Sequence, residues 1–220
     1  MRLALKRMVR GRGARQKQAA PVTFEIASKL LGAVGAGLHG ARDRALLCVA
    51  YDTLCRRSEL VALSVADVQD DEDGSGSILV RRSKGDQEGH GSVRYLAPQT
   101  VQAVRDWLHA AHITEGALFR SLGRAGAVGD PLTPQEVARI LRRLCLRAGI
   151  DPAGIGGHST RVGAAQDMVA AGLEVGEIMQ AGGWKTPVMV ARYAERLSVR
   201  RGAAAKLARA QGRTNPPAGS

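Results

Sequence analysis

The sequence Gly-Gly-His-Ser-Thr-Arg-Val-Gly occupies residues 156–163, and Ala-Gly-Gly-Trp follows at residues 181–184. His158 and Arg161 are three positions apart, which places both on one face of a predicted helix. Trp184 and a single tyrosine, Tyr193, follow, and Tyr193 lies at the centre of a short predicted helix. An imidazole, a guanidinium, an indole N–H and a phenol make this region a candidate site for chemistry on a phosphodiester.

The composition is that of a basic globular protein. The chain has 220 residues, of which 45% are hydrophobic and only 3% aromatic, enough for one domain with an aliphatic core. Its formal net charge is +12 and its pI is about 10.6, a balance that favours a polyanionic partner, usually nucleic acid. Charge alone leaves open a basic protein that binds no nucleic acid.

The cysteines and the apolar runs bear on the compartment. Cys48, Cys55 and Cys145 are odd in number, widely spaced and without a Cys-x-x-Cys pair, which predicts three reduced thiols. No apolar run reaches membrane length, and no signal-peptide core is visible. We therefore expect a soluble, cytoplasmic protein with no membrane partner.

Three regions follow from charge and apolar spacing. Residues 1–20 form a basic arm or linker without a single acid, residues 21–210 a single folded domain, and residues 211–220 a disordered tail. The arm is either a solvated segment or a linker that lies along phosphates. In the second case its DNA-binding residues are Arg10, Arg12, Arg15 and Lys17.

The predicted elements are mostly helical. Apolar spacing and capping signals predict helices near residues 23–34, 41–54, 58–63, 98–111, 134–149, 174–181 and 199–210. A further helix is expected after the His158 segment, with Val162, Ala165 and Val169 inward, and another, capped by Thr186-Pro187, carries Tyr193. Residues 65–68 are expected to be extended, residues 78–82 and 93–97 to form a hairpin, and residues 116–130 a glycine-rich loop. The fold class is therefore mainly α with a small antiparallel sheet (α+β).

The chain has three tyrosines. Tyr51 in a helix and Tyr95 in a strand have structural interpretations. Tyr193 is expected to place its ring off the apolar stripe of its own helix, and periodicity alone favours a functional and a surface role equally.

Arginine suits the charge that develops on a phosphate during cleavage, because its planar fork donates two parallel hydrogen bonds. Arg161 is one candidate and Arg56 is another, with Arg57 an alternative to Arg56. For any single arginine, a surface charge is the simpler interpretation.

Three motifs together resemble a known family. Residues 54–60, Leu-Cys-Arg-Arg-Ser-Glu-Leu, resemble the first conserved box of the tyrosine recombinases, the phage integrase family. Residues 157–161 resemble its His-x-x-Arg box, and residues 181–184 with Tyr193 nine positions later resemble its third part. Trp184 stands where most of the family has His. The resemblance covers residues 21–210 and implies the tyrosine recombinase catalytic-domain fold.

The resemblance also implies roles for the residues that bind the phosphate. Arg56 and Arg161 would clamp the scissile phosphate, with Arg57 outside the pair. Glu59 would position the Arg and His side chains. Trp184 would bind a phosphate oxygen through its indole N–H, because the indole can donate but cannot accept.

The remaining implied roles concern nucleophile and proton transfer. Tyr193 would attack phosphorus to give a 3′-phosphotyrosine and a free 5′-OH. Lys84, in the hairpin turn, would protonate the leaving 5′ oxygen, and His158 would donate to the phosphate or assist proton movement from Tyr193. Arg81 and Arg82, beside that turn, are further candidates for DNA contact.

No cofactor or metal is implied. His109 and His112 share a helix face, but no third ligand lies near them in the sequence. The implied partner is double-stranded DNA, bound by a homotetramer on synapsed sites. The helix at residues 203–210 would either dock on a neighbouring subunit or pack on its own domain.

Two other functions and one structural departure remain open. A type IB topoisomerase has a similar active site but reseals the same strand, and a non-catalytic DNA-binding module would retain only the fold. Recombinases usually carry an N-terminal helical domain, whereas this chain starts at what resembles the interdomain linker. It is expected to be a fragment or a minimal form, with weaker DNA binding.

Overall fold

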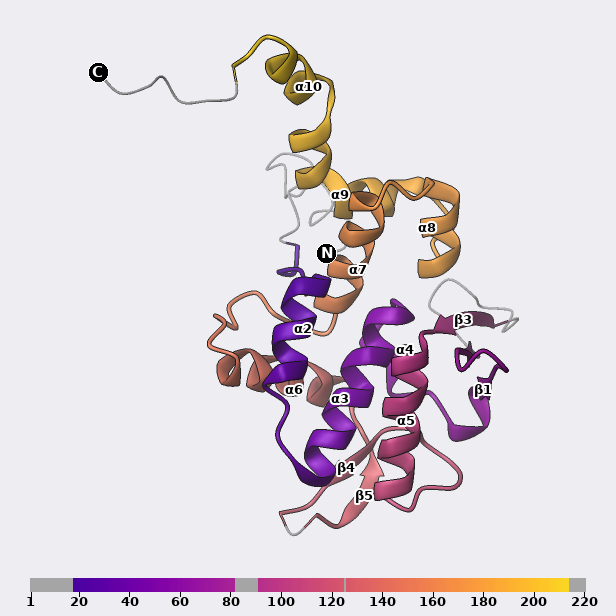
Figure 1. The fold of residues 1–220 in the computed structure, drawn as a ribbon. Helices are drawn as coiled ribbons and strands as arrows, with labels where there is room; N and C mark the ends of the chain where they lie inside the picture. Colours follow the sequence, from indigo (N-terminus) through magenta and orange to yellow (C-terminus); the bar gives the residue numbers. More distant parts are fainter. Residues whose placement is uncertain (1–17, 82–90, 125, 214–220) are drawn as a thin grey trace, which may run out of the picture.

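The computed structural model describes residues 18–81, 91–124 and 126–213 (Figure 1). Its α-helices are α2 (Phe24–Gly32), α3 (Gly37–Asp52), α4 (Arg57–Leu60), α5 (Pro98–Ala110), α6 (Pro134–Arg147), α7 (Ser159–Ala170), α8 (Val175–Gly182), α9 (Pro187–Arg201) and α10 (Ala203–Ala210). Its strands are β1 (Val68–Asp70), β2 (Gly76–Val80), β3 (Ser92–Leu96), β4 (Arg120–Leu122) and β5 (Val128–Pro131). The expected mainly α fold with a small antiparallel sheet is confirmed.

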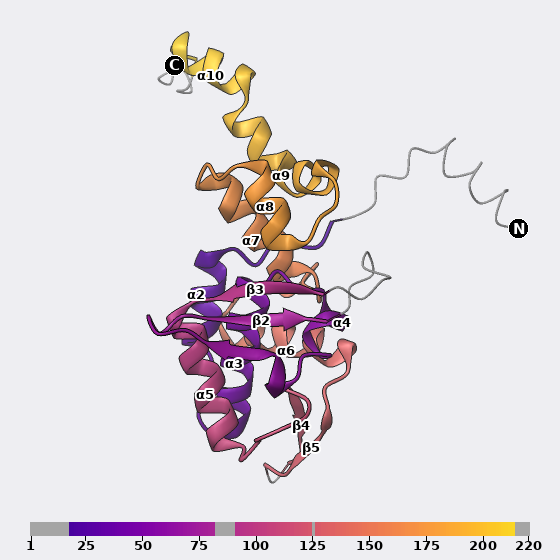
Figure 2. The ribbon, with the colours of Figure 1, turned by 90° about the vertical axis from the view of Figure 1, so that its right-hand side faces the viewer.

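The larger sheet covers one side of the helical body. Its order is β1-β2-β3, all antiparallel, with Val68 opposite Ile78 and Ile78 opposite Arg94. Figure 2 shows this sheet in front of α3, α5 and α6. Ile78, Val80 and Leu96 are buried on its inner face and join the main core. The expected hairpin is therefore confirmed, with a third strand added at one edge.

Three local expectations were wrong. Residues 65–67 form a 3₁₀ turn and not a strand, because the Asp67 carboxylate accepts a hydrogen bond from the Ser64 backbone N–H at 2.9 Å and closes the turn. The glycine-rich stretch at 116–130 contains the two-stranded sheet β4–β5, whose strands are too short to produce an alternating pattern. Helix α9 continues to Arg201, and extended backbone at Gly202 (φ −71°, ψ 177°) separates it from α10.

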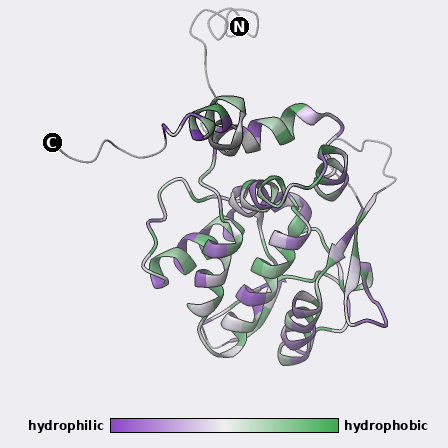
Figure 3. Ribbon diagram, turned by 45° about the horizontal axis from the view of Figure 1, so that its top comes forward, coloured by the Kyte–Doolittle hydropathy of each residue, from purple (hydrophilic) through white to green (hydrophobic). Residues whose placement is uncertain are grey.

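The main core is aliphatic, as the composition predicts, and is built from α2 to α6 and the sheet. Trp107 is fully buried in it, and its indole N–H donates to the Leu118 carbonyl at 2.8 Å. The predicted capping box of α6 is present: Glu136 accepts hydrogen bonds from the Thr133 N–H at 2.7 Å and from its hydroxyl at 2.8 Å. Coloured by hydropathy, the helices of the body show both hydrophobic and hydrophilic residues, as expected for helices with one buried face (Figure 3).

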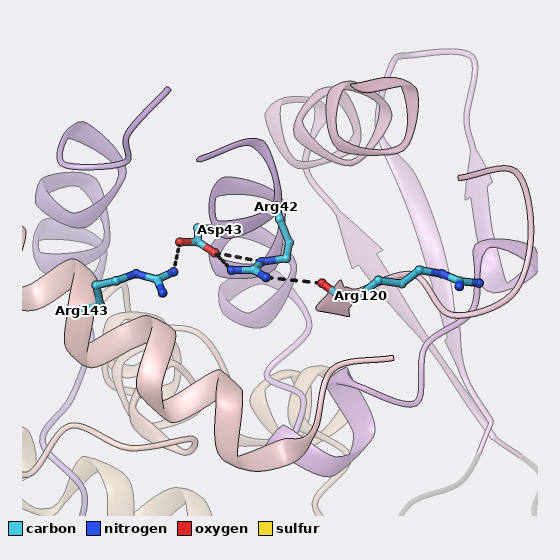
Figure 4. Close-up of polar contacts among 4 residues, drawn as sticks. All are labelled: Arg42, Asp43, Arg120 and Arg143. Atoms are coloured by element: carbon cyan, nitrogen blue, oxygen red, sulfur yellow. Dashed lines mark hydrogen bonds and ion pairs between the residues drawn. The ribbon is translucent and has the colours of Figure 1, made fainter. Parts of the chain in front are cut away.

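A buried charge cluster ties α3 to α6 and β4 (Figure 4). Asp43 is 1% exposed and accepts from Arg42 at 2.8 Å and from Arg143 at 2.5 Å. Arg42, itself 4% exposed, also donates to the Arg120 carbonyl at 3.4 Å. One buried carboxylate therefore pairs with the buried guanidinium of Arg42 and with Arg143, whose side chain is 40% exposed.

A second, smaller apolar cluster joins α7, α8 and α9 to the end of α3. It contains Leu54, Ala164, Ala165, Ile178, Trp184 and Val190. The segment before α2 is pressed against α7: the Val22 N–H donates to the Ser159 carbonyl at 2.8 Å, and a Cβ at Gly163 would lie 1.8 Å from the Val22 carbonyl oxygen. Only glycine fits at position 163 with this spacing.

Cys48, Cys55 and Cys145 are all free thiols. Over the ranges that the structure describes, no helix combines the length and the apolar character needed to cross a membrane.

Candidate active site

Arg56 lies in the turn between α3 and α4. Leu54, just before it, is buried and has the left-handed backbone conformation (φ 53°), which is unfavourable for a side chain of this kind and is concentrated at functional sites. Arg56 Nη1 lies 2.5 Å from Glu59 Oε1, and the Arg56 backbone N–H donates to Glu59 Oε2 at 2.8 Å. Glu59 is buried, whereas the Arg56 side chain is 27% exposed, so the carboxylate orients a guanidinium that still reaches solvent.

Arg57 occupies a different position. It is exposed, and its side chain lies against the backbone of Gly157, where an added Cβ would come within 2.7 Å of Arg57 Cδ. The sequence left Arg56 and Arg57 as alternatives. The structure gives Arg56 the carboxylate partner and places Arg57 on the solvent side of the turn.

Arg161, on α7, is 2% exposed. Its Nη1 donates to the Leu54 carbonyl, and its Nη2 is buried without a hydrogen-bond partner among the described residues. The pKa of Arg161 is lowered to about 10, chiefly by burial and also by the positive charge of Arg56, while Tyr193 and Glu59 act in the opposite direction. The site therefore holds a buried cation with spare hydrogen-bonding capacity.

Trp184 links Arg161 to Tyr193. The indole is 7% exposed, its ring centroid lies 4.3 Å from Arg161 Cζ, and it lies 5.6 Å from the Tyr193 ring centroid at an interplanar angle of 54°. This is the geometry of a cation–π contact beside a tilted aromatic pair. Gly182 makes room for the indole, because a Cβ there would lie 2.0 Å from Trp184 Cζ3.

His158 immediately precedes α7 and is exposed. The turn before it is closed by the Ser159 hydroxyl, which accepts from the Gly156 N–H at 2.9 Å. Burial lowers the pKa of His158, and the charges of Arg161, Arg57 and Arg56 lower it further against a smaller opposing effect of Glu59. These effects favour the neutral form of the imidazole.

His158 and Tyr193 line the same hollow, which has a volume of about 470 Å³. Tyr193 is half-buried against the second apolar cluster, so its ring is less exposed than its position off the apolar stripe indicated. The other lining residues are Gln18, Ala19, Gly154, Val162, Met189 and Arg192.

The structure thus brings together six of the residues singled out in the sequence: Arg56, Glu59, His158, Arg161, Trp184 and Tyr193. It does not bear on the others equally. Arg81, at the end of β2, pairs with Asp67 at 2.5 Å. Lys84, Arg82 and the arm residues Arg10, Arg12, Arg15 and Lys17 lie outside the described residues.

The other two tyrosines make different contacts. The Tyr51 hydroxyl donates to Asp167 Oδ2 at 2.5 Å, and Asp167 also accepts from the Phe24 backbone N–H at 2.6 Å. Asp167, on α7, therefore ties together the start of α2 and the end of α3. Tyr95 is 61% exposed on the outer face of β3.

Sequence reasoning missed Arg94, on β3. Its side chain is 7% exposed and donates through Nη1 to the carbonyls of Gln180, at 2.5 Å, and Ala181. The alternation Val93-x-Tyr95 indicates an apolar inner face, but these two residues face solvent and Arg94 faces inward. A single arginine within a short apolar strand was the available signal.

The described residues were also considered as metal ligands. The described residues contain no cluster of three or more His, Cys, Asp or Glu side chains suited to a metal ion. His109 and His112, the pair noted in the sequence, belong to no such cluster.

The chain resembles known proteins over most of its length. Residues 22–200 match the model of the phage integrase family. An integrase/recombinase XerD homologue of Selenomonas ruminantium is 32% identical over 204 residues, which cover 89% of this chain and 59% of that protein. Recombinase Cre of Escherichia phage P1 is 31% identical over 180 residues, covering 76% of this chain and 52% of that protein. The chain therefore spans between half and three fifths of these relatives.

Solved structures share the fold. XerH recombinase in a post-cleavage complex with a palindromic difH substrate superposes with a TM-score of 0.68 at 20% identity, covering 84% of this chain and 53% of that one. XerA recombinase gives a TM-score of 0.65 at 19% identity, covering 85% and 65%. With the family match over most of the sequence, the chain belongs to the phage integrase family, the tyrosine recombinases.

Proposed function

We propose that this chain is the catalytic part of a site-specific DNA recombinase that cleaves and rejoins strands through a covalent 3′-phosphotyrosine at Tyr193. The Tyr193 oxygen forms a bond to phosphorus, the bond from phosphorus to the 5′ oxygen breaks, and the free strand ends in a 5′-OH. The energy of the phosphodiester is kept in the new linkage, so no ATP is consumed. Attack by the 5′-OH of a different strand reverses the step and completes recombination.

The observation that carries the proposal is the state of Arg161. A buried guanidinium without a carboxylate partner is costly unless an anion completes it. The Nη2 donor of Arg161 has no hydrogen-bond partner among the described residues. Arg56 lies nearby, and its side chain is partly exposed. Two arginines at one phosphate provide strong electrostatic stabilisation of the charge that develops on its non-bridging oxygens.

Proton movement is assigned to His158 and Lys84. The Tyr193 hydroxyl must lose a proton as it attacks, and neutral His158 lines the same hollow. Lys84 protonates the leaving 5′ oxygen, as the resemblance to the family implies. The indole N–H of Trp184 donates to a phosphate oxygen, and Glu59 keeps Arg56 in position.

The partner we propose is double-stranded DNA, bound by a homotetramer at synapsed sites. The net charge of +12 favours a polyanion. The related structures include XerH with its difH substrate and a lambda integrase dimer on a core site. Helix α10 has no buried residues and projects from the body in Figure 1, which suits docking on a neighbouring subunit better than packing on its own domain.

The two other functions are not favoured. A type IB topoisomerase shares the chemistry, but the named relatives are recombinases or integrases. A non-catalytic module has no need of a buried, unfilled Arg161 beside a tyrosine.

The test is covalent capture of DNA from a pool. Duplexes with a nick and a randomised sequence around it are incubated with the protein, and adducts that survive denaturation are isolated and sequenced. We expect a protease-sensitive adduct with the wild type and with the control Tyr95→Phe, and none with Tyr193→Phe. An equal yield from Tyr193→Phe, or no adduct with the wild type, would refute the catalytic proposal.

A second assay separates the recombinase from the topoisomerase. The sequences enriched in the pool are built into two duplexes that can synapse. Four-way junctions and exchanged strands are expected from a recombinase, whereas relaxation of supercoiled plasmid without exchanged strands would favour the topoisomerase.

A further inference from the structure

We infer that Arg94 is a positioning residue of this site, which sets the place of the Trp184 indole by holding the C-terminal end of α8. This inference rests on the proposed strand cleavage for its catalytic consequence but not for its structural one. Arg94 does not belong to the three motifs that the sequence shares with the family.

The first contact is with the last turn of α8. The final carbonyls of a helix have no partner within the helix and carry its negative dipole end. Arg94 Nη1 donates to two of them, those of Gln180 and Ala181. A charged, two-acceptor contact across 86 residues of sequence fixes the end of α8 to β3.

The second contact is with the glycine that ends the helix. Gly183 has the left-handed conformation (φ 61°), and a Cβ there would lie 2.2 Å from Arg94 Nη2. The guanidinium therefore fills the space that the missing side chain leaves. The two glycines of the Ala-Gly-Gly-Trp motif have separate reasons: Gly182 makes room for the indole and Gly183 for Arg94.

The third step runs from the helix end to the site. The backbone N–H of Trp184 donates to the Met179 carbonyl at 2.9 Å. The indole is therefore attached to the turn that Arg94 holds. Trp184 in turn stacks on Arg161 at 4.3 Å and lies beside Tyr193. A displacement of the α8 end therefore moves the surface on which Arg161 rests.

The surroundings explain why this position needs an arginine. Arg94 lies within electrostatic reach of Cys55, Glu59 and Arg56, and it is buried without an ion pair among the described residues. Burial lowers its pKa and the charge of Arg56 lowers it further, against opposing effects of Cys55 and Glu59. The planar guanidinium places Nη1 on the two helix carbonyls and Nη2 beside Gly183 at the same time. A lysine ammonium has a single nitrogen and could not make both contacts.

Arg94 Nε is buried and has no partner in the part of the chain that the structure describes. This leaves a competing role, direct contact with a DNA phosphate. The two roles differ in their salt dependence, because each phosphate contact contributes roughly 0.9 to the slope of log K against log salt.

The structural test uses the two tryptophans as reporters. The full chain is labelled with 5-fluorotryptophan, giving ¹⁹F resonances for Trp107 and Trp184 that are assigned with Trp184→Phe. For Arg94→Met we expect the Trp184 resonance to shift or broaden while that of Trp107, in the main core, stays in place. Gly183→Ala, which displaces the guanidinium from the other side, is expected to produce the same change.

The functional test compares chemistry with binding on the captured DNA. Arg94→Met is expected to slow single-turnover adduct formation by about tenfold or more, with the affinity for intact DNA and its salt slope unchanged. Arg94→Lys is expected to fall between the wild type and Arg94→Met. The matched control is Arg105→Met, which removes an exposed arginine that pairs with Asp70.

Two outcomes overturn the inference: an unmoved Trp184 resonance in both Arg94→Met and Gly183→Ala, or a salt slope reduced by about one contact in Arg94→Met. Failure of the proposed function is a separate result. In that case the wild type forms no adduct, while the ¹⁹F measurement still decides whether Arg94 holds Trp184.

Discussion

Arg161 and Trp184 form a stacked pair inside the domain, with the guanidinium carbon 4.3 Å from the indole centroid. The stacking holds the plane of the guanidinium, and the Leu54 carbonyl holds one of its edges. The other edge, Nη2, is buried and unfilled among the described residues. The pair therefore holds a buried donor in place, next to the indole that also contacts Tyr193.

The first prediction concerns Arg161→Lys. The substitution keeps a positive charge but loses the stacked plane and the second donor, so we expect adduct formation to fall by about 10²–10³-fold. The measurement is single-turnover capture of the DNA selected in the pool. Arg57→Lys is the control, because Arg57 is exposed at the start of α4. Equal rates for both variants would contradict the role given to Arg161.

The second prediction concerns His158 and the pH dependence of stability. The pKa of His158 is lowered in the folded state, so the unfolded chain binds the proton more readily. The contribution of neutral His158 is fully present above the unfolded pKa of about 6.5 and is lost as pH falls through the lower folded pKa. His158→Asn should therefore flatten the fall of the free energy of unfolding with decreasing pH.

Urea denaturation at a series of pH values below and above 6.5 measures this difference. His112→Asn provides the reference slope, since His112 is exposed and its backbone (φ 51°) suits asparagine. A steeper fall at low pH in His158→Asn than in the wild type would contradict the prediction.

The third prediction concerns Asp43. Asp43→Asn leaves Arg42, which is 4% exposed, without its counter-charge, and breaking a buried pair in this way costs about 3–5 kcal/mol. Asp70→Asn breaks the exposed pair with Arg105 and should cost less than about 1 kcal/mol. Denaturant unfolding of both variants measures the two losses in the free energy of unfolding. Similar losses would contradict the prediction that the buried pair contributes more than the exposed one.

Features that depend on residues close together in the sequence could be predicted from it. The capping box at Thr133 and Glu136 is a local pattern, and its helix is present as predicted. The three motifs that resemble the family were recognisable because each keeps its spacing within a few residues. The contact that brings these motifs together could not be predicted from the sequence. Arg161 donates to the carbonyl of Leu54, two residues before Arg56, and Leu54 has the left-handed backbone conformation. Leu54 is not a glycine, so nothing in the sequence signals that conformation.

Long-range contacts account for the other differences. In the strand that contains Arg94, the apolar residues Val93 and Tyr95 face solvent and the arginine faces inward. The reason is that Arg94 binds helix carbonyls 86 and 87 residues further along the chain. The strands β4 and β5 have three and four residues and form only by pairing with each other. Periodicity detects neither kind of contact, since both depend on the tertiary arrangement.

The fourth prediction concerns Gly163. A Cβ at this position would lie 1.8 Å from the Val22 carbonyl oxygen and 2.6 Å from the Thr23 nitrogen, both backbone atoms. Gly163→Ala should therefore destabilise the domain by about 2–3 kcal/mol or displace the segment before α2. Gly176→Ala, in α8 with open space around the Cβ, should instead gain about 0.5–1 kcal/mol. Chemical denaturation of the two variants gives the comparison, and a neutral Gly163→Ala would contradict the tight contact.

The fifth prediction concerns the C-terminal end. Helix α10 has no buried residues and exposes Leu207 by 53%, so it contributes little to the stability of its own domain. A chain that ends at Val199 should therefore unfold at nearly the same denaturant concentration as one that ends at Arg213, which keeps α10. If α10 docks on a neighbouring subunit, the shorter chain should assemble less on DNA, as measured by analytical ultracentrifugation of the protein with two synapsing duplexes. Loss of the folded state in the shorter chain would show that the segment packs on its own domain, and equal assembly of both chains would exclude its docking role.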